Sequence, residues 1–196
     1  SLAERQIKAP VQILKADGGT LPLDEAAVMP EESIFTGPAA SVLGIMALTP
    51  PVQNSISLDV GGTTTDIAFW ENGKPLMARN GASIDCFPTA VRAFHMRSVG
   101  IGGDSIILRN ANGFQVGPER SGPAMAVGGT APALSDALVV LGAVPYGDRR
   151  LAEKAMQSFT LDGERSSDIA KQIVNAALIV IEDAIDEMLY QWSIQP

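Results

Sequence analysis

The residues best suited to chemistry lie in one short segment, Asp59-Val-Gly-Gly-Thr-Thr-Thr-Asp66. Because Gly61 and Gly62 carry no Cβ, a phosphate could lie directly against main-chain N–H groups at this point. Further hydrogen bonds to phosphate oxygens could come from the hydroxyls of Thr63, Thr64 and Thr65. The segment predicts a phosphate-binding loop; the alternative is a Gly-Gly hairpin with threonine-rich arms and a capping aspartate.

Two aspartates bracket this loop. Asp59 is expected at the end of a strand that leads toward the phosphate position, where it could hold Mg²⁺ through water. Asp66 could orient a nucleophile or a polar backbone group at the turn. We therefore predict catalytic roles for Asp59 and Asp66, and a metal-binding role for Asp59 as well.

A second glycine-rich loop, Gly100-Ile-Gly-Gly-Asp-Ser105, follows a predicted strand. Its candidate nucleotide-binding residues are Gly102, Gly103 and Ser105. Asp104 is predicted to ligate a metal, with a turn cap as the alternative. Asp136, which follows Ser135 where a helix is expected to begin, is also predicted as a metal ligand, although this pair is typical of a helix N-cap.

Composition excludes several classes of function. The net charge is −8, so the chain lacks the positive charge that nucleic-acid binding requires. No apolar run approaches the roughly 20 residues that span a bilayer, and residues 1–5 do not begin a secretory signal. Cys86 is the single cysteine, which rules out an intrachain disulfide and favours a cytoplasmic protein. Because the chain starts at Ser1 without an initiator Met, we expect a fragment or a processed chain.

The elements expected to position these loops alternate between strands and helices. Turn residues and apolar runs predict strands over 11–15, 55–59, 66–70, 91–99, 106–108 and 114–116, and helices over 39–48 and 134–141. Residues 117–132 are rich in Gly and Pro and are expected to form an irregular loop. His95, the single histidine, falls in a predicted strand and favours a structural role.

The last predicted element is a long helix with Ser167 as its N-cap. Its apolar stripe recurs every four residues, at Ile169, Ile173, Ala177, Ile181, Ile185 and Leu189. Its acidic residues, Glu182, Asp183, Asp186 and Glu187, are expected to form a solvated face rather than a metal site. The stripe predicts packing against the rest of the lobe or dimerisation.

Taken in order, several segments resemble the hydantoinase/oxoprolinase family of ATP-dependent enzymes that open cyclic amides. The matching segments are Asp17-Gly-Gly19, Thr36-Gly-Pro-Ala-Ala40, Asp59 to Asp66, Gly100-Ile-Gly-Gly-Asp-Ser-Ile106, Gly117-Pro-Glu119 and Ala133-Leu-Ser-Asp-Ala137 before Leu141-Gly142. The resemblance covers roughly residues 10 to 145. Departures from the family pattern include Asp104 for a glycine, Arg97 for a histidine, and Ala133 and Ser135 for two threonines.

The resemblance implies an α/β fold, namely an actin-like ATPase (ribonuclease H-like) lobe with a mixed sheet, flanking helices and a long C-terminal helix. We divide it into a first strand and helix over 1–50, a phosphate-binding core over 51–150 and a helical segment over 151–196. Asp59 to Asp66 would form the second phosphate-binding hairpin, with ATP and Mg²⁺ as cofactors. ATP would phosphorylate the amide oxygen of a small cyclic amide, which water then opens.

The family's first phosphate-binding hairpin and its adenine-side Gly-Gly-Ala-Gly segment do not occur in this sequence. We therefore expect one wall of an ATP cleft, completed by a missing N-terminal lobe or a partner subunit, with a homo-oligomer also possible. Three alternatives stay open: a subunit of a related ATP-dependent carboxylase acting on ketones, a small-molecule kinase, and a non-catalytic actin-like module.

Overall fold

The computed structural model describes residues 1–196 except 1–3, 7, 50–52, 85–86, 162 and 195–196, so the role expected of Cys86 lies outside the described residues. The chain forms two compact units. Unit 1 comprises residues 1–57 and 68–96, and unit 2 comprises residues 58–67 and 97–196. Among the described residues, no helix is both long and apolar enough to cross a membrane.

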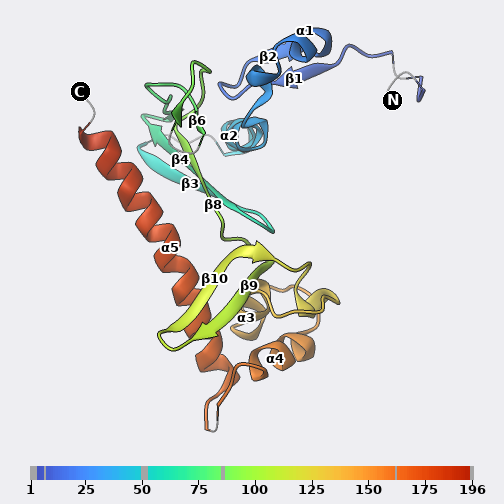
Figure 1. Ribbon diagram of the computed structural model, residues 1–196, viewed down its shortest axis with the longest axis vertical. Helices are drawn as coiled ribbons and strands as arrows, with labels where there is room; N and C mark the ends of the chain where they lie inside the picture. Colours follow the sequence, from blue (N-terminus) through green and yellow to red (C-terminus); the bar gives the residue numbers. More distant parts are fainter. Residues whose placement is uncertain (1–3, 7, 50–52, 85–86, 162, 195–196) are drawn as a thin grey trace. The chain divides into compact units, whose positions relative to one another are not determined.

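Unit 1 begins with a small hairpin followed by helices (Figure 1). Strands β1 (Gln12–Leu14) and β2 (Thr20–Pro22) pair antiparallel, and α1 (Leu23–Val28), a 3₁₀ helix (Pro30–Ser33) and α2 (Thr36–Leu48) follow. Two further short strands, β6 (Ser83–Ile84) and β7 (Phe87–Pro88), pair with each other. The core of the unit gathers small α2 residues and large aromatic residues: Ala39 and Val42 with Ala68, Trp70 and Phe94.

A four-stranded sheet carries the first predicted hairpin. Strand β4 (Thr65–Glu71) lies between β3 (Ser55–Val60) and β5 (Lys74–Pro75), and β8 (Met96–Val99) also pairs with β4. The central position explains the burial of β4, in which residues 67–70 are all buried, whereas the edge strand β3 is mostly exposed. The sheet thus holds the loop over 61–64 between an edge strand and a buried strand.

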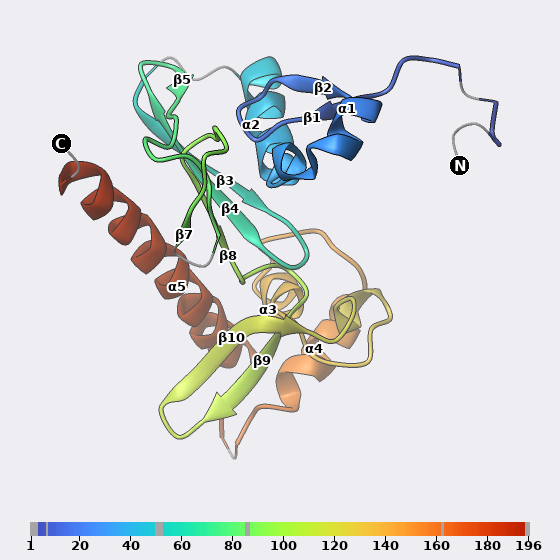
Figure 2. The same ribbon diagram turned by 45° about the horizontal axis from the view of Figure 1, so that its top comes forward.

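Unit 2 packs a hairpin against helices, as Figures 1 and 2 show from two directions. Strands β9 (Ser105–Asn110) and β10 (Gly113–Arg120) pair antiparallel, with a register shift between Val116 and Arg120. Helix α3 (Leu134–Val140) packs on α4 (Arg149–Gln157) and on α5 (Ser166–Ile194), and α5 also packs on β10. A short 3₁₀ helix, η2 (Met125–Val127), lies beside α3 and α4.

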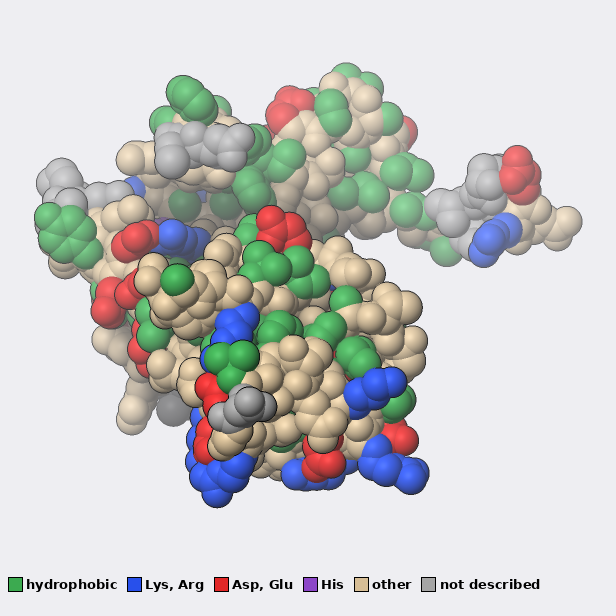
Figure 3. Space-filling model, turned by 60° about the horizontal axis from the view of Figure 1, so that its bottom comes forward, with side chains coloured by type: hydrophobic (Ala, Val, Ile, Leu, Met, Phe, Trp, Pro, Cys, Tyr) green, Lys and Arg blue, Asp and Glu red, His purple; other side chains and the backbone are tan. Residues whose placement is uncertain are grey.

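Charged residues of unit 2 pair with neighbours of opposite sign. On the face turned forward in Figure 3, Lys and Arg side chains alternate with Asp and Glu rather than forming a patch of one sign. Arg109 makes two hydrogen bonds to the carboxylate of Glu164, at 2.9 and 3.1 Å, and stacks over the ring of Phe114. This cluster fixes the β9–β10 hairpin to the loop that precedes α5.

The structure differs from the prediction at four points. The predicted strand over 91–99 forms only from Met96, because residues before it hydrogen-bond at separate points, from Ala82 to Val91 and from Phe94 to Ala16. Helix α4 was not predicted, and residues 117–120, expected in a loop, extend β10. Helix α5 already includes Ser167, so that residue is not its N-cap.

Candidate functional site

The two predicted glycine-rich loops are joined directly by their backbones. The N–H of Gly103 donates to the carbonyl of Gly61 at 2.9 Å, and the N–H of Asp104 donates to that of Gly62 at 2.7 Å. A third segment joins them at the start of α3, where the N–H of Ser135 donates to the carbonyl of Gly103 at 2.8 Å. We call these joined segments, residues 61–65, 102–105 and 133–136, the glycine platform.

Glycine is required where the segments of the platform touch. A Cβ on Gly102 would lie 2.6 Å from the carbonyl carbon of Gly62, and a Cβ on Gly103 would lie 2.6 Å from Oγ of Ser135. Both distances are far below ordinary contact. A larger residue at 102 would meet backbone and force the loops apart, whereas at 103 the hydroxyl of Ser135 would have to turn away. The glycine pair at 102–103 therefore allows the two loops to approach each other closely. The nucleotide contact predicted for Gly102 and Gly103 stays a prediction.

Two predicted nucleotide-binding hydroxyls are used inside the platform. Thr65 is fully buried and its hydroxyl donates to the carbonyl of Ile101 at 2.7 Å. Ser105 is also fully buried, and its Oγ accepts a hydrogen bond from the N–H of Gly102 at 2.9 Å. These hydroxyls hold the shape of the loops; that they also contact nucleotide stays a prediction.

Asp136 has a comparable internal role. Its carboxylate is fully buried and accepts three backbone hydrogen bonds, from the N–H groups of Met125, Ala126 and Ala133, at 2.7 to 3.0 Å. A carboxylate that accepts several N–H bonds in this way fixes the irregular chain around it. Asp136 thus anchors the segment 124–133 to α3, and its predicted role as a metal ligand stays a prediction.

The outer side of the platform presents unused donors. Residues 61–63 are exposed, and the N–H groups of Gly62, Thr63 and Thr64 donate to no acceptor among the described residues. Successive free N–H groups in a loop form a concave site of positive potential that suits an anion. That this part of the platform binds phosphate stays a prediction.

The predicted catalytic aspartates lie on the two strands that flank the loop. Asp59 is exposed near the end of β3. Asp66 lies on β4, and its Oδ1 is buried without a hydrogen-bond partner among the described residues. A buried carboxylate oxygen without a partner is costly, and the catalytic role of Asp66 stays a prediction.

Asp104, also predicted as a metal ligand, forms an ion pair with an arginine side chain. Its Oδ2 lies 2.6 Å from a guanidinium nitrogen of Arg120, and its side chain is 13% exposed. Within the described part of the chain, no three Asp, Glu, His or Cys side chains gather as a metal site, so Asp59, Asp104 and Asp136 do not form a common cluster there. On the sequence alone Arg120 was one of three arginines, with Arg79 and Arg97, that could reach phosphates, but exposed arginines are common and nothing singled it out.

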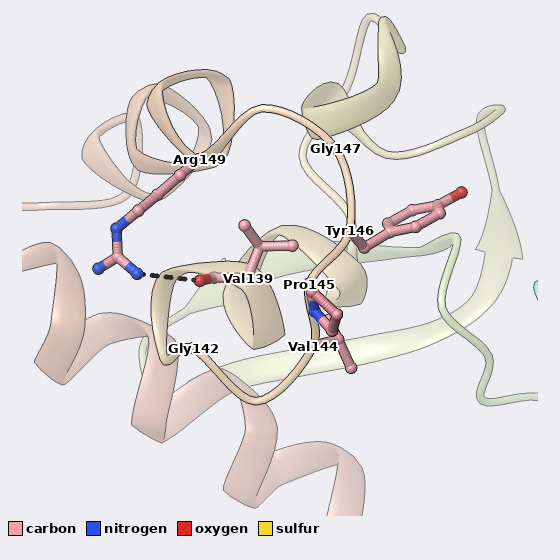
Figure 4. Close-up of a pocket in the computed structure, with 7 residues that line it drawn as sticks. All are labelled: Val139, Gly142, Val144, Pro145, Tyr146, Gly147 and Arg149. Carbon is pink, nitrogen blue, oxygen red and sulfur yellow. Dashed lines mark hydrogen bonds between the residues drawn. The ribbon is translucent and has the colours of Figure 1, made fainter.

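A separate cavity of about 470 Å³ lies near the C-terminal end of α3. Figure 4 shows its lining residues: Val139, Gly142, Val144, Pro145, Tyr146, Gly147 and Arg149. The guanidinium of Arg149 hydrogen-bonds to the carbonyls of Val139 and Val140, which end α3, and the ring of Tyr146 points away from the other labelled side chains (Figure 4). The cavity contains no predicted site residue.

Comparison with known proteins assigns the chain to a family. The hydantoinase/oxoprolinase family profile matches residues 1–196, so the chain belongs to this family, as its motifs predicted. The gamma subunit of acetophenone carboxylase from Aromatoleum aromaticum is 28% identical over 157 residues, which are 74% of this chain and 21% of that protein. The alpha subunit of caprolactamase from Pseudomonas jessenii is 28% identical over 149 residues, 70% of this chain and 21% of that protein.

The fold also has a solved counterpart. The nucleotide-free structure of acetone carboxylase matches with a TM-score of 0.66 and 23% identity, covering 86% of this chain and 26% of that one. This likeness confirms the predicted fold class, a mixed α/β fold of the actin-like ATPase type with a long C-terminal helix. The chain spans about one fifth of the length of the curated relatives that it matches.

Proposed function

We propose that the glycine platform is the phosphate-binding wall of an ATP site in a larger enzyme. The proposal rests on the N–H groups of Gly62, Thr63 and Thr64, which donate to no acceptor among the described residues. The loop that carries them is fixed in place by backbone hydrogen bonds from Gly103 and Asp104. Because Gly62 has no Cβ, phosphate oxygens can approach these groups closely. The structurally similar acetone carboxylase carries out an ATP-dependent carboxylation, which supports ATP as the nucleotide bound at this platform.

Asp59 is the residue that we propose for Mg²⁺. Magnesium at phosphate sites usually keeps several waters and takes one or two carboxylates together with phosphate oxygens. Asp59 lies one residue from the end of β3, next to the glycine loop, and is exposed. When bound, Mg²⁺ would neutralise part of the phosphate charge, and Asp59 would hold it through water.

Asp66 is proposed to orient the group that attacks or accepts phosphate. The reaction that we favour is phosphorylation of the amide oxygen of a small cyclic amide, followed by ring opening with water. This step converts a poor electrophile into one with a good leaving group. The similarity to a caprolactamase subunit supports an amide substrate.

A second candidate is a subunit of an ATP-dependent carboxylase that acts on a ketone. It is favoured by the similarity to an acetophenone carboxylase subunit and to acetone carboxylase. Both candidates use a phosphate-binding platform in the same way and differ in the carbonyl compound. In both, a further lobe or a partner subunit would supply the opposite wall of the ATP site.

The test is an activity assay of the full-length protein, together with any partner subunits encoded beside its gene. It should be supplied with Mg-ATP and either a cyclic amide (5-oxoproline, hydantoin or caprolactam) or a ketone with bicarbonate. A ring-opened acid formed with ADP and phosphate supports the first candidate, and a carboxylated ketone supports the second. ATP binding that is unchanged in Gly62→Val would refute the phosphate role of the platform. Gly44→Ala, at a helical glycine with open space around it, is the matched control.

A further inference from the structure

The ion pair between Asp104 and Arg120 lies on the glycine platform itself. Oδ2 of Asp104 would be 2.9 Å from a Cβ placed on Gly62, so this carboxylate lies directly against the first glycine loop. A negative charge at this position alone would repel a phosphate bound to the same loop. Asp104 stands where the family pattern has glycine, so this charge is a particular feature of the chain.

Arg120 compensates that charge from the neighbouring strand. It is the last residue of β10 and pairs in register with Ser105 of β9, so its backbone is fixed beside the second glycine loop. One guanidinium nitrogen lies 2.6 Å from Oδ2 of Asp104. A guanidinium has five N–H donors in a planar fork, and this contact uses only part of them.

The two partners differ in exposure. The side chain of Asp104 is 13% exposed, whereas that of Arg120 is 46% exposed. The carboxylate is therefore held inside the platform, and the guanidinium lies at its surface with donors open to solvent. This arrangement is typical of an arginine that is oriented by a carboxylate and presents its remaining donors to an anion.

We propose that Arg120 binds a phosphate of ATP, and that Asp104 is the positioning residue that orients its guanidinium. This inference rests on the proposed function of the platform. Phosphate oxygens would be held by the backbone N–H groups of residues 62–64 and by the outward donors of Arg120. Asp104 would then act through Arg120 rather than as the metal ligand that the sequence suggested.

The experiment measures binding to the full-length protein by calorimetry, with Mg-ATP, inorganic tripolyphosphate and adenosine as three separate probes. Arg120→Gln should weaken binding of Mg-ATP and tripolyphosphate by about 10- to 100-fold and leave adenosine binding unchanged. Arg120→Lys should recover only part of the loss, because an ammonium lacks the planar fork. Arg150→Gln, which removes a 90% exposed arginine of the same unit, is the matched control and should match wild type.

Asp104→Asn separates the positioning role from the alternatives. It should weaken tripolyphosphate binding several-fold with no change in the Mg²⁺ concentration that half-saturates ATP binding. A rise in that Mg²⁺ concentration would identify Asp104 as a metal ligand and overturn the proposal. Lower melting temperatures of both variants with unchanged tripolyphosphate binding would show a purely structural ion pair, which also overturns it. If wild-type protein binds neither Mg-ATP nor tripolyphosphate, the proposed function itself fails.

Discussion

The hydroxyl of Thr65 donates a hydrogen bond to the backbone carbonyl of Ile101, 2.7 Å away and fully buried. This bond ties the first residue of β4 to the segment that opens the second glycine loop. Together with the backbone bonds from Gly103 to Gly61 and from Asp104 to Gly62, it makes the two loops one rigid piece. A phosphate site built on this piece would be preorganised before the ligand arrives.

Thr65→Val should therefore destabilise the protein without altering its outer surface. Valine has a similar shape but leaves the carbonyl of Ile101 buried and unsatisfied, which costs about 1–3 kcal/mol of unfolding free energy. Urea denaturation measures the loss. Thr63→Val, at an exposed position of the same loop, should change stability by no more than about 0.5 kcal/mol. Equal stability of the two variants would show that the buried hydrogen bond contributes nothing.

Substitutions at two glycines of the platform should have separable effects. Gly102→Ala places a Cβ 2.6 Å from backbone atoms, so it should destabilise the fold by about 1–3 kcal/mol. Gly62→Ala meets only the carboxylate end of Asp104, a side chain that can move, so it should cost less stability and mainly weaken nucleotide binding. Denaturation and calorimetry on both variants check this. A larger loss of stability in Gly62→Ala would contradict the geometry.

Asp136→Asn should be among the most destabilising single-atom changes in unit 2. Three backbone N–H groups donate to the carboxylate of Asp136. In asparagine an NH₂ group would replace one of the two acceptor oxygens and face an N–H donor, which should lower the unfolding free energy by about 3 kcal/mol. The exposed Asp148 offers a control, since it accepts one hydrogen bond at the N-terminus of α4. Asp148→Ala should cost about 1 kcal/mol. If urea denaturation shows that Asp136→Asn lowers the unfolding free energy no more than Asp148→Ala does, the anchoring role assigned to Asp136 is wrong.

His95 should titrate below its ordinary value. Burial, followed by the nearby charge of Arg79, lowers the pKa of this imidazole from 6.5, because both disfavour the charged form. The neutral side chain thus contributes stability above pH 6.5, and this contribution falls as the pH drops toward the lower folded pKa, since the unfolded chain takes up the proton first.

Because the chain has a single histidine, an NMR titration of the imidazole signals gives this pKa directly. His95→Gln should flatten the dependence of the unfolding free energy on pH between about 7 and 5. A measured pKa at or above 6.5 would contradict the effect of burial.

The sequence allowed the motifs to be found, but not the way in which they meet. The Gly-Gly pairs and the Thr-rich turn indicated two loops because these residue types have direct backbone consequences. That Gly103 bonds to Gly61 and to Ser135 depends on tertiary packing, which no local pattern encodes. Arg120 was one of three arginines that could reach phosphates, but the sequence could not single it out, since an arginine becomes informative only when its partner is known.

The helices illustrate the same limit. The apolar stripe of α5 was predicted at every fourth residue, but a helix turns about 100° per residue, so each such step drifts by about 40°. Ile169 and Ile173 are accordingly buried, whereas Leu189 is exposed and Met188 takes the inner position. Helix α4 escaped prediction because its inner face is made of small residues, Ala152 and Ala155, with one methionine.

The position of Gly103 has a consequence for folding kinetics. Its N–H and its carbonyl bind segments from two distant parts of the sequence, so the platform needs two long chain closures before it exists. Such closures are entropically slow and come after local helices have formed. In a refolding experiment, recovery of tripolyphosphate binding should therefore lag behind recovery of far-ultraviolet circular dichroism.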